Sequence, residues 1–401
     1  MKRKFSALSA LPFTAFSNLR GLVLPILATF LLVSCSADPK PENPLMTILQ
    51  SKNSAIASVM ANPEVFEVQI RYSRISRKGD SVLWKDYDFN LVPEAYFYPA
   101  STVKFPIAVL ALEKLNHLDS LSQTTRYAVE GDSLENTFEQ DILNIFAVSD
   151  NHANNRLLEF LGQDAINDNL QAKQAGPVRI SHRLGVHDDD VTTKPIIWYL
   201  NDSLPVQSTP IINRPATALT IPGIQKGMGY REGDSLIKRP FDFSLKNYLP
   251  LNTLDGVLKR VIFPQQFPLS QRFNISESQR EFLLNAMQIT PREAGFDPET
   301  FPDGYCKFFM FGDVSDTIPE DLQIFNKVGF AYGTLTDCAY VHDARNGVEF
   351  ILSATILAND NQIFNDDLYE YDQIGIPFLA ALGRAVYNFE AKSRGSEIQF
   401  Q

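Results

Sequence analysis

The sequence predicts an α+β fold: a five-stranded antiparallel sheet flanked by an N-terminal and a C-terminal helix, with a mainly helical subdomain inserted between strands. Two observations predict it. Strand-like alternation occurs near the start and near the end of the chain, and the long section between them shows mostly helical periodicity. Strands that are separated by a block of helices in this way are typical of α+β proteins.

The expected elements follow one another as helix, two strands, helical block, three strands and helix. We expect helices at residues 45–60, 105–118, 138–146, 153–161, 254–261, 277–287 and 374–389, and strands at residues 66–75, 81–90, 322–330, 335–342 and 348–358. An Arg-Lys-Gly-Asp turn at 77–80 separates the first two strands, and Gly162 is a usual residue at a helix end. From about residue 120 to residue 200 the pattern is helical.

Residues 201–250 interrupt this periodicity with six prolines and four glycines. A long irregular segment is often functional, so this insertion is a candidate lid or wall of a site. We therefore expect one domain over residues 45–390, with the helical subdomain at about 120–300 and a tail at 391–401.

The N-terminus has the features of an export signal. Three basic residues at positions 2–4 precede an apolar run over residues 21–33, which is too short to span a bilayer. This pattern predicts a signal peptide over residues 1–34. The proline-rich residues 35–44 are expected to form a tether.

The Leu-x-Ser-Cys sequence that ends at Cys35 resembles the lipobox of bacterial lipoproteins. The resemblance implies cleavage before Cys35, lipidation of its thiol and attachment to a membrane of the cell envelope, at the outer membrane or the periplasmic face. An ordinary signal peptide or an N-terminal membrane anchor is the alternative. No later apolar run is long enough to span a membrane.

The charge of the chain argues against nucleic acid as a partner. The formal charge is −11, and residues 1–34 carry four cations and no acids, so their removal leaves −15. A strongly acidic protein repels a phosphate backbone.

The cysteines and histidines do not predict a metal site. Cys306 and Cys338 lack the spacing of a zinc site. They could form a disulfide or remain two free thiols, and the expected burial of Cys338 in a strand argues for free thiols. His182 and His187 lie near the acidic residues 188–190, for which a surface turn is a better interpretation than a metal site. No cofactor is expected.

Ser101 and Lys104 are the most informative pair in the chain. They lie three residues apart in Tyr-Pro-Ala-Ser-Thr-Val-Lys, at the start of a predicted apolar helix, where residues i and i+3 share a face. A serine becomes a good nucleophile when a base takes its proton, and a lysine can be that base when burial or a second cation lowers its pKa. The Ser-x-x-Lys spacing is also expected to occur by chance, and Ser235-x-x-Lys238 in the insertion is such an occurrence.

Two further segments contain candidate site residues besides Ser101 and Lys104. Ser149-Asp150-Asn151 lies between two predicted helices, where each of its residue types is also a common helix N-cap. Lys327-Val328-Gly329 lies near the end of a predicted strand, where an ordinary strand lysine before a turn glycine is the alternative.

Taken in order, the three segments resemble the Ser-x-x-Lys, Ser-Asp-Asn and Lys-Thr/Ser-Gly motifs of the penicillin-recognising serine hydrolases, which include class A β-lactamases and penicillin-binding proteins. The hairpin sequence Tyr332-Gly333-Thr334, followed by Asp337, is similar as well. The resemblance covers about residues 45–390 and implies a β-lactamase-like or transpeptidase-like fold.

The resemblance implies a role for each catalytic residue. Ser101 attacks an acyl carbonyl, and Lys104 is the base. Ser149 relays a proton to the leaving nitrogen. Lys327 supplies positive charge, which helps to keep Lys104 neutral and attracts an anionic substrate.

The same resemblance implies substrate-binding roles for three further residues. Asn151 positions a substrate amide, and Gly329 lets the strand approach the ligand closely. The backbone N–H groups of Ser101 and Phe330 form the oxyanion hole.

The chain departs from the family pattern in three places. Val328 replaces the hydroxyl residue of the third motif, and no Lys or Arg lies between Lys327 and Arg345. The class A Glu-x-x-Leu-Asn segment, whose glutamate positions the deacylating water, is absent after Ser149. Residues 188–190 are acidic, but they are expected to form a solvated turn.

We therefore expect a serine acyl-transfer hydrolase that acts on a β-lactam, on a peptidoglycan-derived peptide or on a related amide or ester. A penicillin-binding or DD-peptidase-like enzyme with slow deacylation is one alternative. A non-catalytic, tethered protein that binds cell-wall material is another. The absence of a Gly-x-Ser-x-Gly sequence argues against an α/β-hydrolase.

Overall fold

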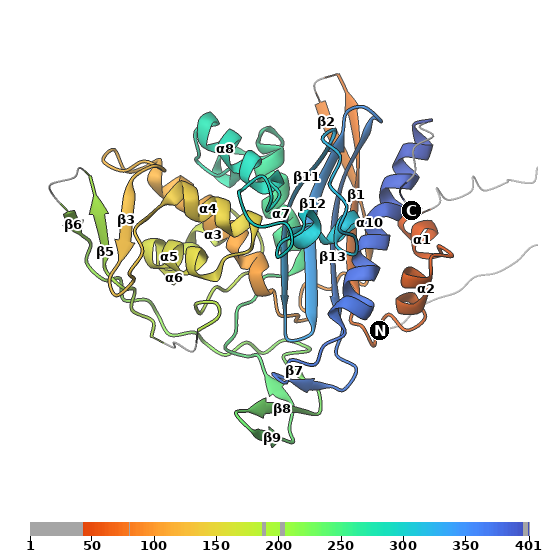
Figure 1. Ribbon diagram of the computed structural model, residues 1–401, viewed down its shortest axis with the longest axis horizontal. Helices are drawn as coiled ribbons and strands as arrows, with labels where there is room; N and C mark the ends of the chain where they lie inside the picture. The colour runs from red at the N-terminus through yellow and green to blue at the C-terminus, as the bar shows by residue number, and fades with distance from the viewer. Residues whose placement is uncertain (1–42, 80, 187–189, 201–204, 396–399, 401) are drawn as a thin grey trace, which may run out of the picture. The chain divides into compact units, whose positions relative to one another are not determined.

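A five-stranded antiparallel sheet with the strand order β11-β12-β13-β1-β2 forms the centre of the computed structural model (Figure 1). The structure describes residues 43–79, 81–186, 190–200, 205–395 and 400. The strands of the sheet are β1 (Gln69–Lys78), β2 (Ser81–Phe89), β11 (Leu322–Ala331), β12 (Thr334–Asp343) and β13 (Val348–Leu357). Because β13 pairs with β1, the two ends of the described chain meet in one sheet, as the predicted α+β fold requires.

The N-terminal and C-terminal helices cover one face of this sheet (Figure 1). They are α1 (Pro44–Leu49), α2 (Ser54–Met60) and α10 (Ile376–Ser393), with the short α9 (Phe308–Phe311) beside α10 and a π-turn, η5 (Tyr371–Gly375), before it. The single helix expected at 45–60 is wrong. Asn53 accepts hydrogen bonds from the N–H groups of Ala55 (3.0 Å) and Ile56 (3.4 Å), and this N-cap begins a second helix.

The helical subdomain lies on the opposite face (Figure 1). Its helices are α3 (Lys104–Leu115), α4 (Phe138–Ala147), α5 (Asn151–Leu161), α6 (Gln163–Ala172), α7 (Leu251–Ile262) and α8 (Glu277–Gln288). Helix α3 is buried from Lys104 to Glu113, which explains why its sequence is apolar on every side. Helix α7 packs on β1, β12 and β13 and joins the subdomain to the sheet.

The expected helical pattern at residues 120–200 is wrong in part. A four-stranded sheet, in the order β4-β3-β5-β6, is formed by β3 (Arg126–Val129), β4 (Asn136–Thr137), β5 (Ile196–Tyr199) and β6 (Pro205–Gln207). These strands are too short to show a period of their own. They pair with partners distant in sequence, such as Tyr127 with Trp198.

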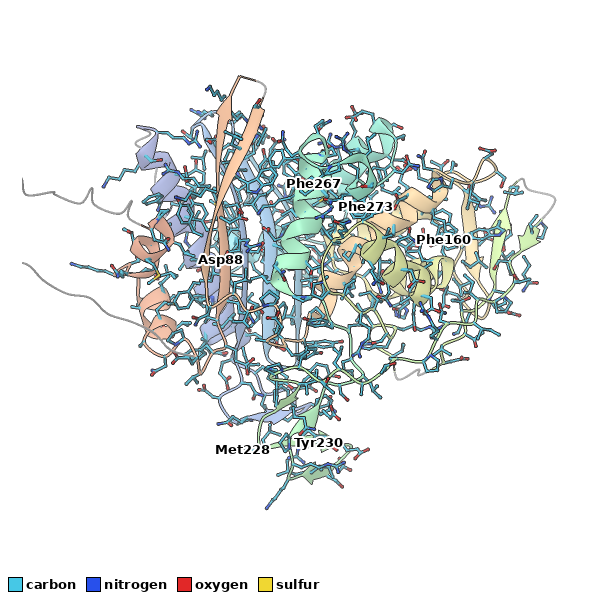
Figure 2. All side chains as sticks on the ribbon, turned by 180° about the vertical axis from the view of Figure 1, so that it is seen from behind. Asp88, Phe160, Met228, Tyr230, Phe267 and Phe273 are labelled. Atoms are coloured by element: carbon cyan, nitrogen blue, oxygen red, sulfur yellow. The ribbon has the colours of Figure 1, made fainter. Side chains whose placement is uncertain are left out.

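The insertion at 201–250 contains short strands rather than irregular chain throughout. These are β7 (Gln225–Lys226), β8 (Gly229–Glu232), β9 (Ser235–Ile237) and β10 (Phe241–Asp242), and β8 pairs in parallel with β14 (Ile363–Phe364). Figure 2 shows Met228 and Tyr230 in the part of the insertion that extends away from the central sheet. Phe241 and Phe243 pack against the rings of Tyr98 and Tyr332.

Cys306 and Cys338 are both buried and both free, so the two thiols do not form a disulfide. Cys338 lies in β12 as expected. The predicted signal peptide, the lipobox residue Cys35 and most of the predicted tether lie outside the described residues. Within the described parts of the chain, none of the helices combines the length and the apolar character needed to cross a membrane.

Candidate active site

Ser101 lies in a single 3-10 turn, η1 (Ala100–Val103), that runs directly into α3. Residues i and i+3 eclipse one another in such a turn, so Ser101 and Lys104 lie on the same side of the chain. Ala100, immediately before Ser101, has a φ of +47°. This conformation is costly for a residue with a Cβ atom, and such strain concentrates at functional sites.

Ser149 brings the lysines of the first and third motifs together. Lys104 Nζ donates to the carbonyl oxygen of Ser149 and to Ser149 Oγ (3.2 Å). Lys327 Nζ donates to the same Oγ at 2.8 Å and to the carbonyl oxygen of Val328 at 2.8 Å. Ser149 also has a positive φ, +57°. Residues far apart in the sequence therefore share one hydrogen-bonding atom.

Burial makes both amines less basic than a free lysine. Lys104 is 0% exposed and Lys327 is 2% exposed. Burial, followed by the charge of Lys327, holds the pKa of Lys104 well below its usual range. Burial lowers the pKa of Lys327 to about 8. A lysine in this environment can be an uncharged base near neutral pH.

Ser101 Oγ faces the cleft and is not bonded to Lys104. Among the hydrogen bonds of the described residues, none joins Lys104 Nζ to Ser101 Oγ, while Ser101 is one of the residues that line the cleft. Catalytic hydrogen bonds are often long in an unliganded enzyme and tighten when the substrate binds.

Two residues of the second motif have different structural roles. Asp150 caps α5, accepting from the N–H groups of His152 (2.7 Å) and Ala153 (3.3 Å), so the N-cap interpretation holds for this residue. Asn151 is the first residue of α5, and its side chain lines the cleft. A Cβ atom at Gly185 would lie 2.7 Å from Asn151 Nδ2, so the following loop packs closely on this amide.

Gly329 allows β11 to lie against η1. A Cβ atom at Gly329 would lie 2.7 Å from the carbonyl oxygen of Pro99 and 2.8 Å from the backbone nitrogens of Ser101 and Thr102. Real Cβ atoms are not found at such distances, so only glycine fits between the strand and the turn. Phe330, the next residue, is 45% exposed at the cleft.

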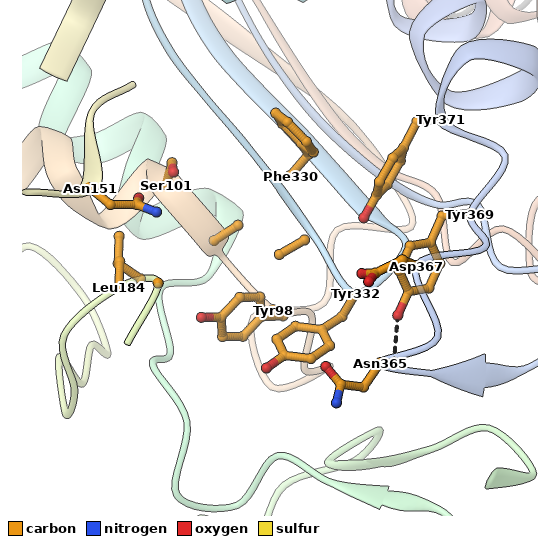
Figure 3. A pocket seen from close by; sticks show the side chains of 13 residues that line it. Tyr98, Ser101, Asn151, Leu184, Phe330, Tyr332, Asn365, Asp367, Tyr369 and Tyr371 are labelled. Atoms are coloured by element: carbon orange, nitrogen blue, oxygen red, sulfur yellow. Dashed lines mark hydrogen bonds between the residues drawn. The ribbon is translucent and has the colours of Figure 1, made fainter. Parts of the chain in front are cut away.

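A cleft of about 480 Å³ opens next to Ser101 (Figure 3). Its lining includes four tyrosines, one asparagine and one aspartate to which the sequence analysis gave no role in the site: Tyr98, Tyr332, Tyr369, Tyr371, Asn365 and Asp367. The dense tyrosines just before the last predicted helix are the only sequence signal for this wall. The insertion at 201–250 supports the wall from behind, through Phe241 and Phe243.

A third buried lysine lies near the site and was also missed. Lys307 Nζ donates to the carbonyl oxygens of Met287 (2.8 Å) and Ile324 (3.1 Å) and to Asn326 Oδ1 (2.8 Å), and burial lowers its pKa to about 8. Asn326 in turn donates to Asp337 Oδ1 at 2.9 Å. This network holds β11 in place beside Lys327.

The remaining sequence candidates lie outside the cleft. Ser235 and Lys238 are exposed in the insertion, so the second Ser-x-x-Lys match has no site around it. Asp190 accepts from the N–H of Thr192 at 2.8 Å and does not line the cleft. Residues 187–189 lie outside the described residues.

His182 is part of the packing around the cleft. Its ring stacks on Tyr98 with ring centroids 6.3 Å apart, and its Nε2 accepts from the N–H of Asn247 at 3.2 Å. Where the chain is described, no group of three or more potential metal ligands occurs.

Comparison with solved structures finds β-lactamases. The β-lactamase from Sphaerobacter thermophilus is 13% identical, with 88% of this chain and 97% of that chain covered, at a TM-score of 0.48. The β-lactamase from Desulfarculus baarsii has the same values. The class A β-lactamase from Mycobacterium abscessus is 14% identical, with 83% and 97% covered, at a TM-score of 0.46. No curated protein matches the chain.

A family model described as the beta-lactamase enzyme family matches residues 81–201. This segment contains Ser101, Lys104 and Ser149, and the fold adds Lys327 to them. Over this segment the chain is similar to the beta-lactamase enzyme family.

Proposed function

We propose that this protein is a serine acyl-transfer hydrolase of the β-lactamase type, which forms an acyl-enzyme on Ser101 with β-lactams or related amides and esters. The observation that carries the proposal is the pair of buried lysine amines on Ser149 Oγ, next to the turn that holds Ser101. A base with a lowered pKa and a proton relay within reach of a helix-terminal serine are what acyl transfer needs.

Acylation begins at Ser101. Neutral Lys104 takes the proton of Ser101 Oγ as this oxygen attacks the carbonyl carbon of the substrate. The carbonyl oxygen becomes an oxyanion, and the backbone N–H groups of Ser101 and Phe330 are the proposed donors to it. The close approach at Gly329 supports this assignment, because it brings β11 beside the turn that carries Ser101.

Ser149 is the proposed proton donor to the leaving nitrogen. Its Oγ accepts from Lys104 and from Lys327, so its lone pairs are occupied and its own proton is available to donate. Lys104, protonated in the first step, then returns a proton to Ser149 as the C–N bond breaks. Asn151 is proposed to hold the substrate amide, since its side chain lines the cleft.

The position of the carboxylates around the cleft favours a second candidate function. Among the described residues that line the cleft, Asp367 is the only carboxylate, and Figure 3 shows it away from Ser101. A deacylating water therefore has no carboxylate base next to Ser101 within the described part of the site. This observation favours, as the alternative, a penicillin-binding or DD-peptidase-like enzyme with a long-lived acyl-enzyme.

Covalent labelling tests the proposal. A fluorescent penicillin or a fluorophosphonate should label the wild-type protein and the control variant Ser235→Ala, which changes the chance Ser-x-x-Lys match, but not Ser101→Ala. Loss of the label, followed by mass spectrometry over hours, separates turnover from stable acylation. Absence of labelling with every probe would instead favour a tethered protein that binds without turnover.

We also propose that the protein is held at a membrane of the cell envelope through a lipid on Cys35, on the basis of the lipobox sequence. Cys35→Ala should move the protein from the membrane fraction to the soluble fraction, as judged by fractionation and immunoblotting. Membrane retention of the variant would contradict the lipid anchor.

A further inference from the structure

The cleft beside Ser101 is acidic and aromatic. Asp367 is the only side chain among its described lining residues that is charged at neutral pH, and no Lys, Arg or His is among them. Five of the other twelve lining residues are tyrosine or phenylalanine. The two lysines of the site lie outside this lining, buried at Ser149.

Asp367 is available to a ligand. It is exposed, has a φ of +58° and makes neither a hydrogen bond nor an ion pair with another described residue. Figure 3 shows its carboxylate beside Tyr369 and directed into the cavity. The neighbouring Asp366, in contrast, accepts from Asn361 Nδ2 (2.8 Å) and from the N–H of Leu368 (3.1 Å).

The rings next to Asp367 are held in place. The hydroxyl of Tyr369 accepts from the N–H of Asn365 at 2.7 Å, and the hydroxyl of Tyr371 accepts from the N–H of Gly333 at 2.8 Å. The two rings lie 5.3 Å apart, and Phe330 meets Tyr371 edge to face at 5.4 Å. Fixed aromatic faces beside a carboxylate attract a cation through the ring quadrupole as well as through the charge.

The groups that would hold an anionic substrate are missing from the same cleft. Val328 offers no hydroxyl, and no Lys or Arg occurs between Lys327 and Arg345. Lys327 is 2% exposed, and its amine is occupied by Ser149 Oγ and the carbonyl oxygen of Val328.

We propose that the cleft selects acyl substrates that carry a positively charged ammonium group, which Asp367 and the rings of Tyr369 and Tyr371 would bind, over substrates that carry a carboxylate. This inference rests on the proposed acylation of Ser101. It adds the charge of the preferred substrate to that function.

The test uses phenyl esters of one acyl chain that ends in trimethylammonium, in its neutral isostere tert-butyl, or in carboxylate. The wild-type protein should show the highest kcat/KM for the cationic ester and the lowest for the anionic ester. Asp367→Asn should lower the cation-to-neutral ratio about fivefold, the size expected of a partly exposed ion pair, and Asp366→Asn should leave this ratio unchanged. Added salt should reduce the ratio in the wild-type protein but not in Asp367→Asn.

Direct binding separates the failure of this inference from the failure of the proposed function. Benzyltrimethylammonium should bind to Ser101→Ala in calorimetry, and adding Asp367→Asn should weaken this binding about fivefold. Ser101-dependent hydrolysis with no preference for the cationic ester would overturn the inference and leave the function standing. Cation binding without acylation of Ser101 by any ester or β-lactam would overturn the function and retain the cation site. If benzyltrimethylammonium does not bind and the cationic ester is not preferred, the inference is overturned.

Discussion

Three buried lysines lie near the candidate active site, and each is held differently. Lys307 donates to three protein acceptors, the full capacity of an ammonium group, and so acts as a structural cation. Lys104 and Lys327 instead converge on Ser149, where the charge of Lys327 adds to burial in lowering the pKa of Lys104. The three lysines therefore divide into one that packs the structure and two that belong to the proposed catalytic site.

Lys104→Met should abolish labelling of Ser101 by a fluorescent penicillin. The variant keeps a similar side-chain volume in this buried position but removes the base, so a loss on the order of a hundredfold or more is expected. Gel fluorescence measures the labelling, and circular dichroism checks the fold. Lys238→Met is the matched control, because Lys238 is exposed in the insertion and should not affect labelling. Full labelling of Lys104→Met would show that another group is the base.

Acylation by a neutral ester should follow a bell-shaped pH profile. Lys104 acts when it is unprotonated, so the rate rises as pH increases through its lowered pKa. Lys327 loses its charge above about 8, so the rate falls beyond that value. Stopped-flow kinetics with a neutral ester measures both limbs. Lys327→Arg keeps its charge at high pH and should lose the descending limb, whereas an unchanged limb in this variant would exclude Lys327 as its source.

At the scale of elements, the site depends on two close approaches and on the point where α5 begins. Strand β11 meets η1 through Gly329, α5 begins at Asn151, and the loop at Gly185 covers the Asn151 amide. Each contact is made by an element that packs for another reason, because β11 belongs to the sheet and α5 to the helical subdomain. The geometry of the site is thus set by how these elements pack.

Gly329→Ala tests the contact between β11 and η1. The added methyl group would lie 2.7 Å from the carbonyl oxygen of Pro99, so strand and turn must separate. We expect a destabilisation of about 2 kcal/mol in urea unfolding. Because reacting groups would move apart, acylation should slow on the order of a hundredfold in the labelling assay.

Gly79→Ala is the matched control for Gly329→Ala. Gly79 has a φ of +59° and open space around it, so this change introduces backbone strain without crowding the site. It should lower the stability by about 1 kcal/mol and leave the acylation rate intact. An equal loss of acylation in both variants would show that reduced stability, rather than the contact at Gly329, explains the effect.

The boundaries of the elements show where the local sequence pattern was sufficient to predict the secondary structure. The strand expected at residues 348–358 is observed as β13, and the helix expected at 277–287 is observed as α8, because both have clear periodicity over ten or more residues. The short strand β3 was missed because its partner β5 is distant in the chain, and local periodicity does not reveal a pairing of this kind. The break before α2 depends on one capping side chain, Asn53.

At the scale of the whole molecule, buried charges connect the helical subdomain to the sheet. Asp255 of α7 is 1% exposed and pairs with Lys259 at 2.8 Å and with Arg71 of β1 at 3.7 Å. Lys259 also reaches Asp86 of β2 at 2.8 Å. A buried charge that loses its partner is costly, so these pairs fix the position of α7 on the sheet.

Asp255→Ala should therefore destabilise the protein by about 3 kcal/mol, measured by urea unfolding. Asp321→Ala removes an exposed partner of Arg345 and should cost about 0.5 kcal/mol or less. Similar losses in the two variants would contradict the structural role of the buried pair. A fall in labelling of Ser101 by Asp255→Ala at low temperature, where the fold is intact, would show that the position of α7 also affects the site.

The sequence by itself determined the fold class and the separation of the strands by a helical block, because periodicity is a local property, and its resemblance to a known family pointed to the residues of the three motifs. Only the tertiary structure decided that Ser149 lies between Lys104 and Lys327, that burial lowers the pKa of both amines, and that an aromatic wall with Asp367 faces Ser101. The contacts at Ser149 join it to residues 45 and 178 positions away in the chain, and no local pattern encodes such contacts or the burial that accompanies them.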